Sequence, residues 1–366
     1  MPALARVLAT PDRFDLQILW TRIDAPGARQ RRQELAFRLD PQRWFAAASL
    51  VKLPLALMAL ERLAERDWPL SGTHLEAQWP VDCTPALHSG PQLPPLREPL
   101  SRTLMRLLVV SDNEASNRLY QWLGPPQTQN WLHRKGLTSA RIVRPLMVCT
   151  EPALGRLGAW RLSGADTATL AAGAGRATGK RPGFPFGRVL RGRAWAEEGK
   201  RIDGPHDFTD ANFLTLAQMQ QLLMAVVRPE LLAPRDRLSL RENDRLWLRD
   251  VLRTRPSERT DPYWPAVDFP DWYAKFLLVG DGKSAWPEGV KIYNKVGQSY
   301  GYLSDVAYIE DASNGSAFFL AATLSVDLDG TLNDGQYAYD EVGLPFLTAL
   351  GQAILAEERR SRAGIR

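Results

Sequence analysis

The feature that most constrains the fold is a stretch at residues 49–63 that would be apolar on almost every side of a helix. A helix of this kind must be covered on all of its faces, so we expect it at the centre of a core. The stretch is interrupted by Lys52 and is too short to cross a bilayer. A chain of 366 residues is long enough to build such a core around it.

Strand patterns lie on both sides of this helix, towards the two ends of the chain. Residues 14–23 and 34–39 alternate apolar and polar side chains across a turn with Pro26 and Gly27, which predicts a hairpin. Three late strands are expected at 290–296, 303–309 and 317–326, followed by a last helix at 342–357. The middle of the chain has helical patterns at 100–123, 215–227 and 241–253 and one extended loop at 173–204.

This order predicts an α/β fold of the α+β type, with an antiparallel sheet made from both chain ends and flanked by helices. The middle of the chain is expected to form a helical subdomain. We predict a single domain over residues 1–366, with the α/β subdomain at about 1–66 and 288–366. The helical subdomain then covers about 67–287, including an inserted segment at 173–285.

Composition excludes several classes of function. The 46 basic and 41 acidic residues are scattered along the chain, so we expect no nucleic-acid partner. Two cysteines, Cys83 and Cys149, provide neither a disulfide framework nor a zinc set, and whether they pair stays open. The four histidines lack metal-ligand spacing, so no metal and no cofactor are expected. Residues 1–13 lack the pattern of an export signal, and no membrane span is expected.

The first chemical motif is SxxK at the start of the central helix, with Ser49 and Lys52. An offset of three residues places both side chains on one side of a helix. A serine hydroxyl needs a nearby base to become a nucleophile, and a lysine can be that base when burial lowers its pKa. Ser49 is therefore the candidate nucleophile and Lys52 the candidate base, although SxxK alone is common.

The second motif is the tripeptide SDN at Ser111, Asp112 and Asn113, which interrupts a helical pattern. Ser111 could pass a proton from Lys52 to a leaving group, and the Asn113 amide could hold a carbonyl of the substrate. A plain polar break or cap within a helix would have the same letters.

The third motif is Lys295, Val296 and Gly297 at the end of an expected strand. Lys295 would supply positive charge, and Gly297 would let the backbone approach a substrate. Gln298 follows on the strand edge, where its N–H and that of Ser49 could form an oxyanion hole. An ordinary edge strand is the alternative.

SxxK, SDN and a KTG-like triplet in this order resemble the signature of class A β-lactamases and penicillin-binding proteins. The chain resembles the penicillin-recognising serine enzyme superfamily along its whole layout, and most closely its β-lactamase-like serine hydrolases. The resemblance implies a β-lactamase/transpeptidase-like fold. Residues 150–154 also resemble the omega loop of class A enzymes, which implies that Glu151 activates the water for deacylation.

Two departures from the family pattern bear on the function. Val296 replaces a hydroxyl residue that normally helps to hold the substrate carboxylate, and Gly155 stands where the omega loop has asparagine. We therefore expect a serine hydrolase that forms an acyl-enzyme on Ser49 and cleaves an amide or ester, a β-lactam ring included. The alternatives are a non-hydrolytic penicillin-binding or sensor protein and a D-amino acid peptidase or esterase.

The expected partner is a small acyl substrate such as a β-lactam or a cell-wall peptide. We expect a monomer. Likeness to the family favours a periplasmic or secreted protein.

Overall fold

A computed structural model describes residues 2–23, 32–77, 97–146, 160–163, 169–171, 184–259, 261, 264–265 and 267–363. The chain divides into two compact units, each described here by itself. The sheet unit consists of Met1–Leu50, Gly183–Ala233 and Trp272–Arg366. The helical unit consists of Val51–Pro182 and Pro234–Asp271.

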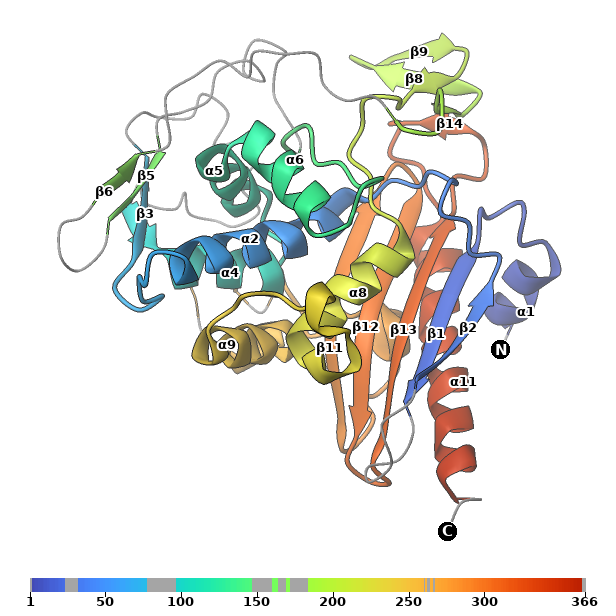
Figure 1. Cartoon of the computed structure of the whole chain (residues 1–366). Helices are drawn as coiled ribbons and strands as arrows, with labels where there is room; N and C mark the ends of the chain where they lie inside the picture. Colours follow the sequence, from blue (N-terminus) through green and yellow to red (C-terminus); the bar gives the residue numbers. More distant parts are fainter. Residues whose placement is uncertain are drawn as a thin grey trace. The chain divides into compact units, whose positions relative to one another are not determined.

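The sheet unit is built on a five-stranded antiparallel sheet in the order β11-β12-β13-β1-β2 (Figure 1). Both chain ends contribute to it, because β1 pairs with β13 and places Gln17 opposite Thr323. This confirms the predicted hairpin, the three late strands and the fold class. The strands are β1 (Gln17–Ile23), β2 (Arg32–Phe37), β11 (Val290–Ser299), β12 (Tyr302–Asp311) and β13 (Ser316–Ser325).

Helices cover both faces of this sheet (Figure 1). Strand residues alternate between the faces, and Phe318 of β13 lies in one apolar core with Phe346 of α11 (Leu344–Ala363). On the other face, Gln220 of α8 (Leu216–Val227) donates to Thr21 Oγ1 at 2.6 Å. Thr21 stands opposite Phe319, so α8 and α11 lie on opposite faces. The unit also contains α1 (Pro2–Ala9), which packs on α11, the short α10 (Phe276–Val279), and the helical segments η2 (Pro229–Leu231) and η5 (Tyr339–Gly343).

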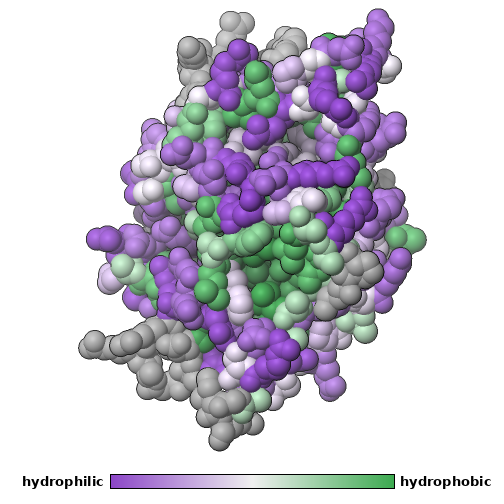
Figure 2. Space-filling model, turned by 90° about the vertical axis from the view of Figure 1, so that its right-hand side faces the viewer, coloured by the Kyte–Doolittle hydropathy of each residue, from purple (hydrophilic) through white to green (hydrophobic). Residues whose placement is uncertain are grey.

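Strand β2 is one of the two edge strands of the sheet, and all six of its residues are exposed. Leu35 and Phe37 on this strand and Leu8 on α1 are large apolar side chains among the exposed residues. Figure 2 looks onto the side of Figure 1 that carries α1 and β2 and shows a green apolar area among purple polar atoms. The charged Arg32 and Glu34 on the same strand are of the kind that limits edge-to-edge pairing of sheets.

Short strands also form between residues 190 and 207, where an extended loop was expected. Strand β8 pairs with β9 and, in parallel, with β14, while β7 pairs with β10. The loop prediction was wrong here because the β8–β9 turn uses Glu198 and Gly199, both at positive φ, without the Asn-Gly or Asp-Gly signal. These strands are β7 (Leu190–Arg191), β8 (Ala194–Glu197), β9 (Lys200–Asp203), β10 (His206–Asp207) and β14 (Thr331–Leu332).

The helical unit is organised around α2 (Lys52–Ala64), which packs against α4, α5 and α6. Its residues from Lys52 to Glu61 are all buried, as the apolar pattern predicted. The other helices are α4 (Leu100–Val109), α5 (Asn113–Leu123), α6 (Pro125–Arg134) and α9 (Glu242–Arg253). A four-stranded sheet in the order β4-β3-β5-β6 completes the unit: β3 (His74–Ala77), β4 (Arg97–Pro99), β5 (Trp160–Ser163) and β6 (Thr169–Ala171).

The pattern at residues 100–123 forms two helices, α4 and α5, rather than one. Ser111 between them has φ 58°, a left-handed conformation that cannot continue a helix. Asp112 then caps α5, because its Oδ1 accepts from Ala115 N–H at 3.0 Å. The SDN tripeptide is thus the connection between two helices.

The two units divide the chain differently from the expected subdomains. Helix α8 belongs to the sheet unit, although residues 67–287 were expected to be helical subdomain, and α2 belongs to the helical unit. In the part of the chain that the structure describes, no helix combines the length and the apolar composition that a membrane crossing requires.

Candidate active site

Ser49 lies in a single 3₁₀ turn, η1 (Ala48–Val51), which leads without interruption into α2. Ala48, immediately before the serine, has φ 44°. A left-handed alanine costs of the order of 1–2 kcal/mol, a strain that proteins often place at functional residues. The turn is closed by Leu50 N–H, which donates to the Ala47 carbonyl at 2.9 Å. The half-buried Ser49 is therefore held in a tight turn three residues before Lys52.

Within the sheet unit, β11 passes directly beside this turn. A Cβ added to Gly297 would lie 2.7 Å from Ala47 O and 3.2 Å from Leu50 Cγ. Any side chain at this position would therefore displace the turn that carries Ser49. The structure brings together Gly297 and the Ser49 turn, two features that the sequence indicated separately.

Lys295, two residues earlier on β11, is 1% exposed, and its Nζ donates to the Val296 carbonyl at 3.0 Å. The pKa of Lys295 is lowered to about 7, mainly by burial; the nearby Asp305 acts to raise this pKa and Lys275 acts to lower it. The side chain therefore changes its charge close to neutral pH.

A buried polar network lies on the α11 side of β11 and β12. Lys275 Nζ donates to Asn294 Oδ1 at 2.6 Å, and Asn294 Nδ2 donates to Asp305 Oδ1 at 2.8 Å. The other oxygen of Asp305 accepts from the N–H groups of Phe276 and Leu277, each at 3.0 Å. Burial raises the pKa of Asp305 to about 6, against the effect of these hydrogen bonds and of Lys275. Sequence reasoning missed this network, and its signal would have been polar residues within apolar strands.

The neighbours of Lys295 on β11 face different surroundings. Gln298 is exposed, and among the described strands β11 is an edge strand that pairs with β12. Val296 is 5% exposed and belongs to the apolar core under α11. The substituted residue of the triplet therefore packs into the core.

In the helical unit, the structure brings together Lys52, Ser111 and Asn113. Lys52 is fully buried, and its Nζ lies 3.2 Å from Ser111 Oγ and 2.7 Å from Asn113 Oδ1. The same nitrogen also donates to the Ser111 carbonyl. Three of the predicted site residues thus form one hydrogen-bonded group.

Behind this group, Arg106 of α4 is buried among three carboxylates. Its guanidinium donates to Glu98 Oε1, Asp112 Oδ2 and Glu114 Oε2, each at 2.8 Å. Arg118 also pairs with Glu114. Through Asp112 and Glu114, Arg106 links α4 to the start of α5. Sequence reasoning missed it, although an arginine among the leucines of α4 was the available signal.

The predicted deacylation base, Glu151, lies outside the described residues, as do Gly155, Cys83 and Cys149. The role of Glu151 stays a prediction. Among the described residues, no group of three or more His, Cys, Asp or Glu side chains could hold a metal ion.

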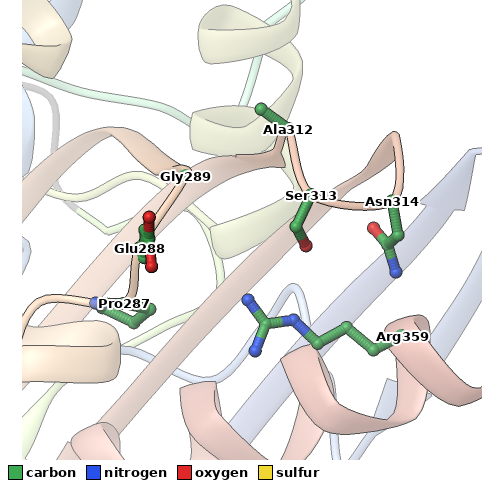
Figure 3. A pocket seen from close by; sticks show the side chains of 7 residues that line it. All are labelled: Pro287, Glu288, Gly289, Ala312, Ser313, Asn314 and Arg359. Carbon is green, nitrogen blue, oxygen red and sulfur yellow. The ribbon is translucent and has the colours of Figure 1, made fainter.

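A separate pocket of about 760 Å³ lies at the other end of β11 (Figure 3). It is bounded by residues 287–289 and 312–314, and Arg359 reaches into it from α11. Eight residues lie between Gly289 and Gln298, so the two are about 30 Å apart along extended chain. This pocket is therefore remote from Gly297 and Gln298 at the other end of β11.

Comparison with known proteins identifies the family. A profile of the β-lactamase enzyme family matches residues 27–336. The chain belongs to this family. Membership in the β-lactamase enzyme family confirms the resemblance seen in the three motifs, and it makes the chain a member of a family of hydrolases. No curated protein sequence matches the chain.

Solved structures show the same fold at low identity. The β-lactamase from Desulfarculus baarsii is 17% identical over 96% of this chain and 97% of that chain, with a TM-score of 0.55. The chromosome-encoded β-lactamase of Vibrio parahaemolyticus is 13% identical over 97% and 98%, also at 0.55. A mutant of PBP-A, an acyl-enzyme complex with penicillin G, is 15% identical over 97% and 95%, at 0.50. These likenesses confirm the predicted β-lactamase/transpeptidase-like fold.

Proposed function

We propose that the chain is a serine hydrolase that forms an acyl-enzyme on Ser49 and cleaves an amide or ester bond, with β-lactams among its substrates. The observation that carries this proposal is the contact of Lys52 Nζ with Ser111 Oγ and Asn113 Oδ1. Lys52 follows Ser49 by three residues, and Ser49 stands in a turn with a left-handed residue, Ala48. Membership in the β-lactamase enzyme family supports it.

In acylation, Ser49 Oγ attacks the substrate carbonyl carbon while Lys52 Nζ takes the hydroxyl proton. The 3.2 Å contact allows this proton to pass through Ser111 Oγ to the leaving nitrogen or oxygen. A bond from carbon to Ser49 Oγ forms as the bond to the leaving group breaks. The N–H groups of Ser49 and Gln298 are the proposed donors to the oxyanion.

Two further side chains are proposed to bind the substrate. The Asn113 amide would hold a carbonyl of the acyl side chain, and Lys295 would attract a carboxylate when it is charged. Water then attacks the acyl-enzyme and releases the acid, with Glu151 as the proposed base.

A second candidate function is that of a penicillin-binding protein or D-amino acid esterase with slow turnover of β-lactams. Val296 favours this function, because its side chain has no hydroxyl and packs into the core. The triplet therefore offers no hydroxyl to the carboxylate of a β-lactam. The acyl-enzyme complex of the PBP-A mutant with penicillin G, which has a similar fold, is consistent with this possibility.

The test compares the wild type with Ser49→Ala and, as a matched control, with Ser71→Ala, an exposed serine in the turn after α2. Each protein is incubated with nitrocefin, a fluorescent penicillin and a D-alanine ester, and product release and intact mass are recorded. Turnover that is lost in Ser49→Ala alone supports the hydrolase.

Other outcomes separate the alternatives. Labelling of Ser49 by penicillin without product supports the slow penicillin-binding protein, and turnover of the ester alone supports the esterase. Activity that persists in Ser49→Ala would contradict the proposed mechanism.

A further inference from the structure

The turn between β11 and β12 has an unusual residue at its tip. Ser299 pairs with Tyr302, so the turn contains two central residues, Tyr300 at φ 51° and Gly301 at φ 78°. Such turns favour Asn or Gly at the first position, and a left-handed tyrosine is strained. Strain of this kind is retained where a side chain is needed at its place.

The Tyr300 ring belongs to a cluster of aromatic side chains, which we call the aromatic platform: Trp195, His206, Phe208 and Tyr300. Trp195 of β8 stacks on His206 at 3.7 Å between ring centroids with an interplanar angle of 13°. Tyr300 lies 5.6 Å from Trp195 and 5.1 Å from Phe208. Trp195, His206 and Tyr300 are half-exposed, whereas Phe208 is buried beneath them. The platform therefore offers aromatic surface to a ligand.

The same cluster continues to the segment that carries Ser49. Phe208 stacks on Trp44 at 4.7 Å, and Trp44 precedes Ser49 by five residues. Tyr300, in the turn directly after β11, follows Gly297 by three residues, which limits their Cα separation to about 10 Å. Because Gly297 touches the Ser49 turn, the platform stands next to the part of β11 that would bind an acyl chain.

The charges beside the platform are of both signs. The Arg191 guanidinium lies 5.9 Å from the Trp44 ring and donates to the Trp44 carbonyl, and Asp207, next to His206, pairs with Arg188 at 2.9 Å. These charges favour neither a cation nor an anion, whereas a neutral aromatic group would stack on the half-buried rings. We propose that the aromatic platform selects acyl substrates that carry an aromatic group on the acyl side, an inference that rests on the proposed function.

The test uses two esters with the same leaving group, p-nitrophenyl phenylacetate and p-nitrophenyl acetate. The ratio of their kcat/KM values is measured in the wild type, in Trp195→Ala and in Tyr300→Asn. We expect the ratio to fall about tenfold in each variant, mainly through the phenylacetyl ester. Tyr300→Asn removes the ring without disturbing the turn, because asparagine is favoured at this position. The Tm of this variant should therefore not fall, and a lower ratio cannot be attributed to misfolding.

Trp272→Ala is the matched control, because Trp272 is a 38% exposed tryptophan of the same unit that packs at Gly282. Its ratio should equal that of the wild type. Turnover that depends on Ser49 with an unchanged ratio in Trp195→Ala and Tyr300→Asn would overturn the platform alone. No turnover that depends on Ser49 with either ester would overturn the proposed function and the platform with it.

Discussion

Replacing Arg106 by methionine tests whether the buried charges behind the SDN connection hold the helical unit together. In the wild type this guanidinium is fully buried and forms ion pairs with Glu98, Asp112 and Glu114. Methionine fills part of the volume but leaves the three carboxylates buried. Arg118, which pairs with Glu98 and Glu114, is then the arginine that remains in this network. The variant should therefore be strongly destabilised.

The size of the effect follows from burial. Removing one partner of a buried ion pair costs about 3–5 kcal/mol, since the other charge stays desolvated. With an unfolding entropy of about 2.1 cal/mol/K per residue, this corresponds to a Tm lower by about 4–7 °C for a chain of 366 residues. Calorimetry or thermal unfolding followed by circular dichroism measures this shift.

The control is Arg253→Met in α9 of the same unit. Arg253 pairs with Asp250 at 2.6 Å, but the two side chains are 35% and 39% exposed, each more than a third. Exposed pairs contribute about 0–1 kcal/mol, so the Tm should change by about 1 °C or less. A shift in Arg106→Met no larger than that in Arg253→Met would refute the reasoning.

Two further predictions concern the turn of Ser49 and the charge of Lys295. Gly297→Ala should slow acylation of Ser49 by about 100-fold in stopped-flow labelling, because its Cβ would lie 2.7 Å from Ala47 O; an unchanged rate would contradict this contact. Lys295, with its pKa near 7, is cationic below that pH, so KM for a carboxylate-bearing substrate should rise above about pH 7. Lys295→Arg should remove this rise, and a neutral ester should not show it.

The sequence allowed the fold to be predicted wherever a pattern was long and periodic. The apolar run at residues 49–63 predicted the buried α2 and alternation predicted β1 and β2, while β-branched and aromatic residues with turn signals between them predicted the three late strands. SxxK and SDN indicated that Lys52, Ser111 and Asn113 belong to one group, and their side chains meet in the structure.

Other features depend on how separate elements pack. Glu98 and Glu114 lie only eight residues from Arg106 in the chain, but they stand on β4 and α5, and the helical pattern does not show that both carboxylates turn back to the same guanidinium. The strands between residues 190 and 207 are two to four residues long, too short for a periodic signal. The two-residue turn between β11 and β12 has Tyr300 at the position where Asn is favoured, so the sequence lacks the Asn-Gly signal that predicts a hairpin.

The pairing of β1 with β13 also determines when the five-stranded sheet can be completed during synthesis. Thr323, the partner of Gln17, leaves the ribosome about 300 residues later, which at 5–20 residues per second is a delay of roughly 15–60 s. During that time β1 can pair with β2, but Ile18 and Leu19, buried in the finished sheet, lack their partners Ala322 and Ala321 on β13. We therefore expect the yield on overexpression to depend on how long these apolar side chains stay uncovered during translation.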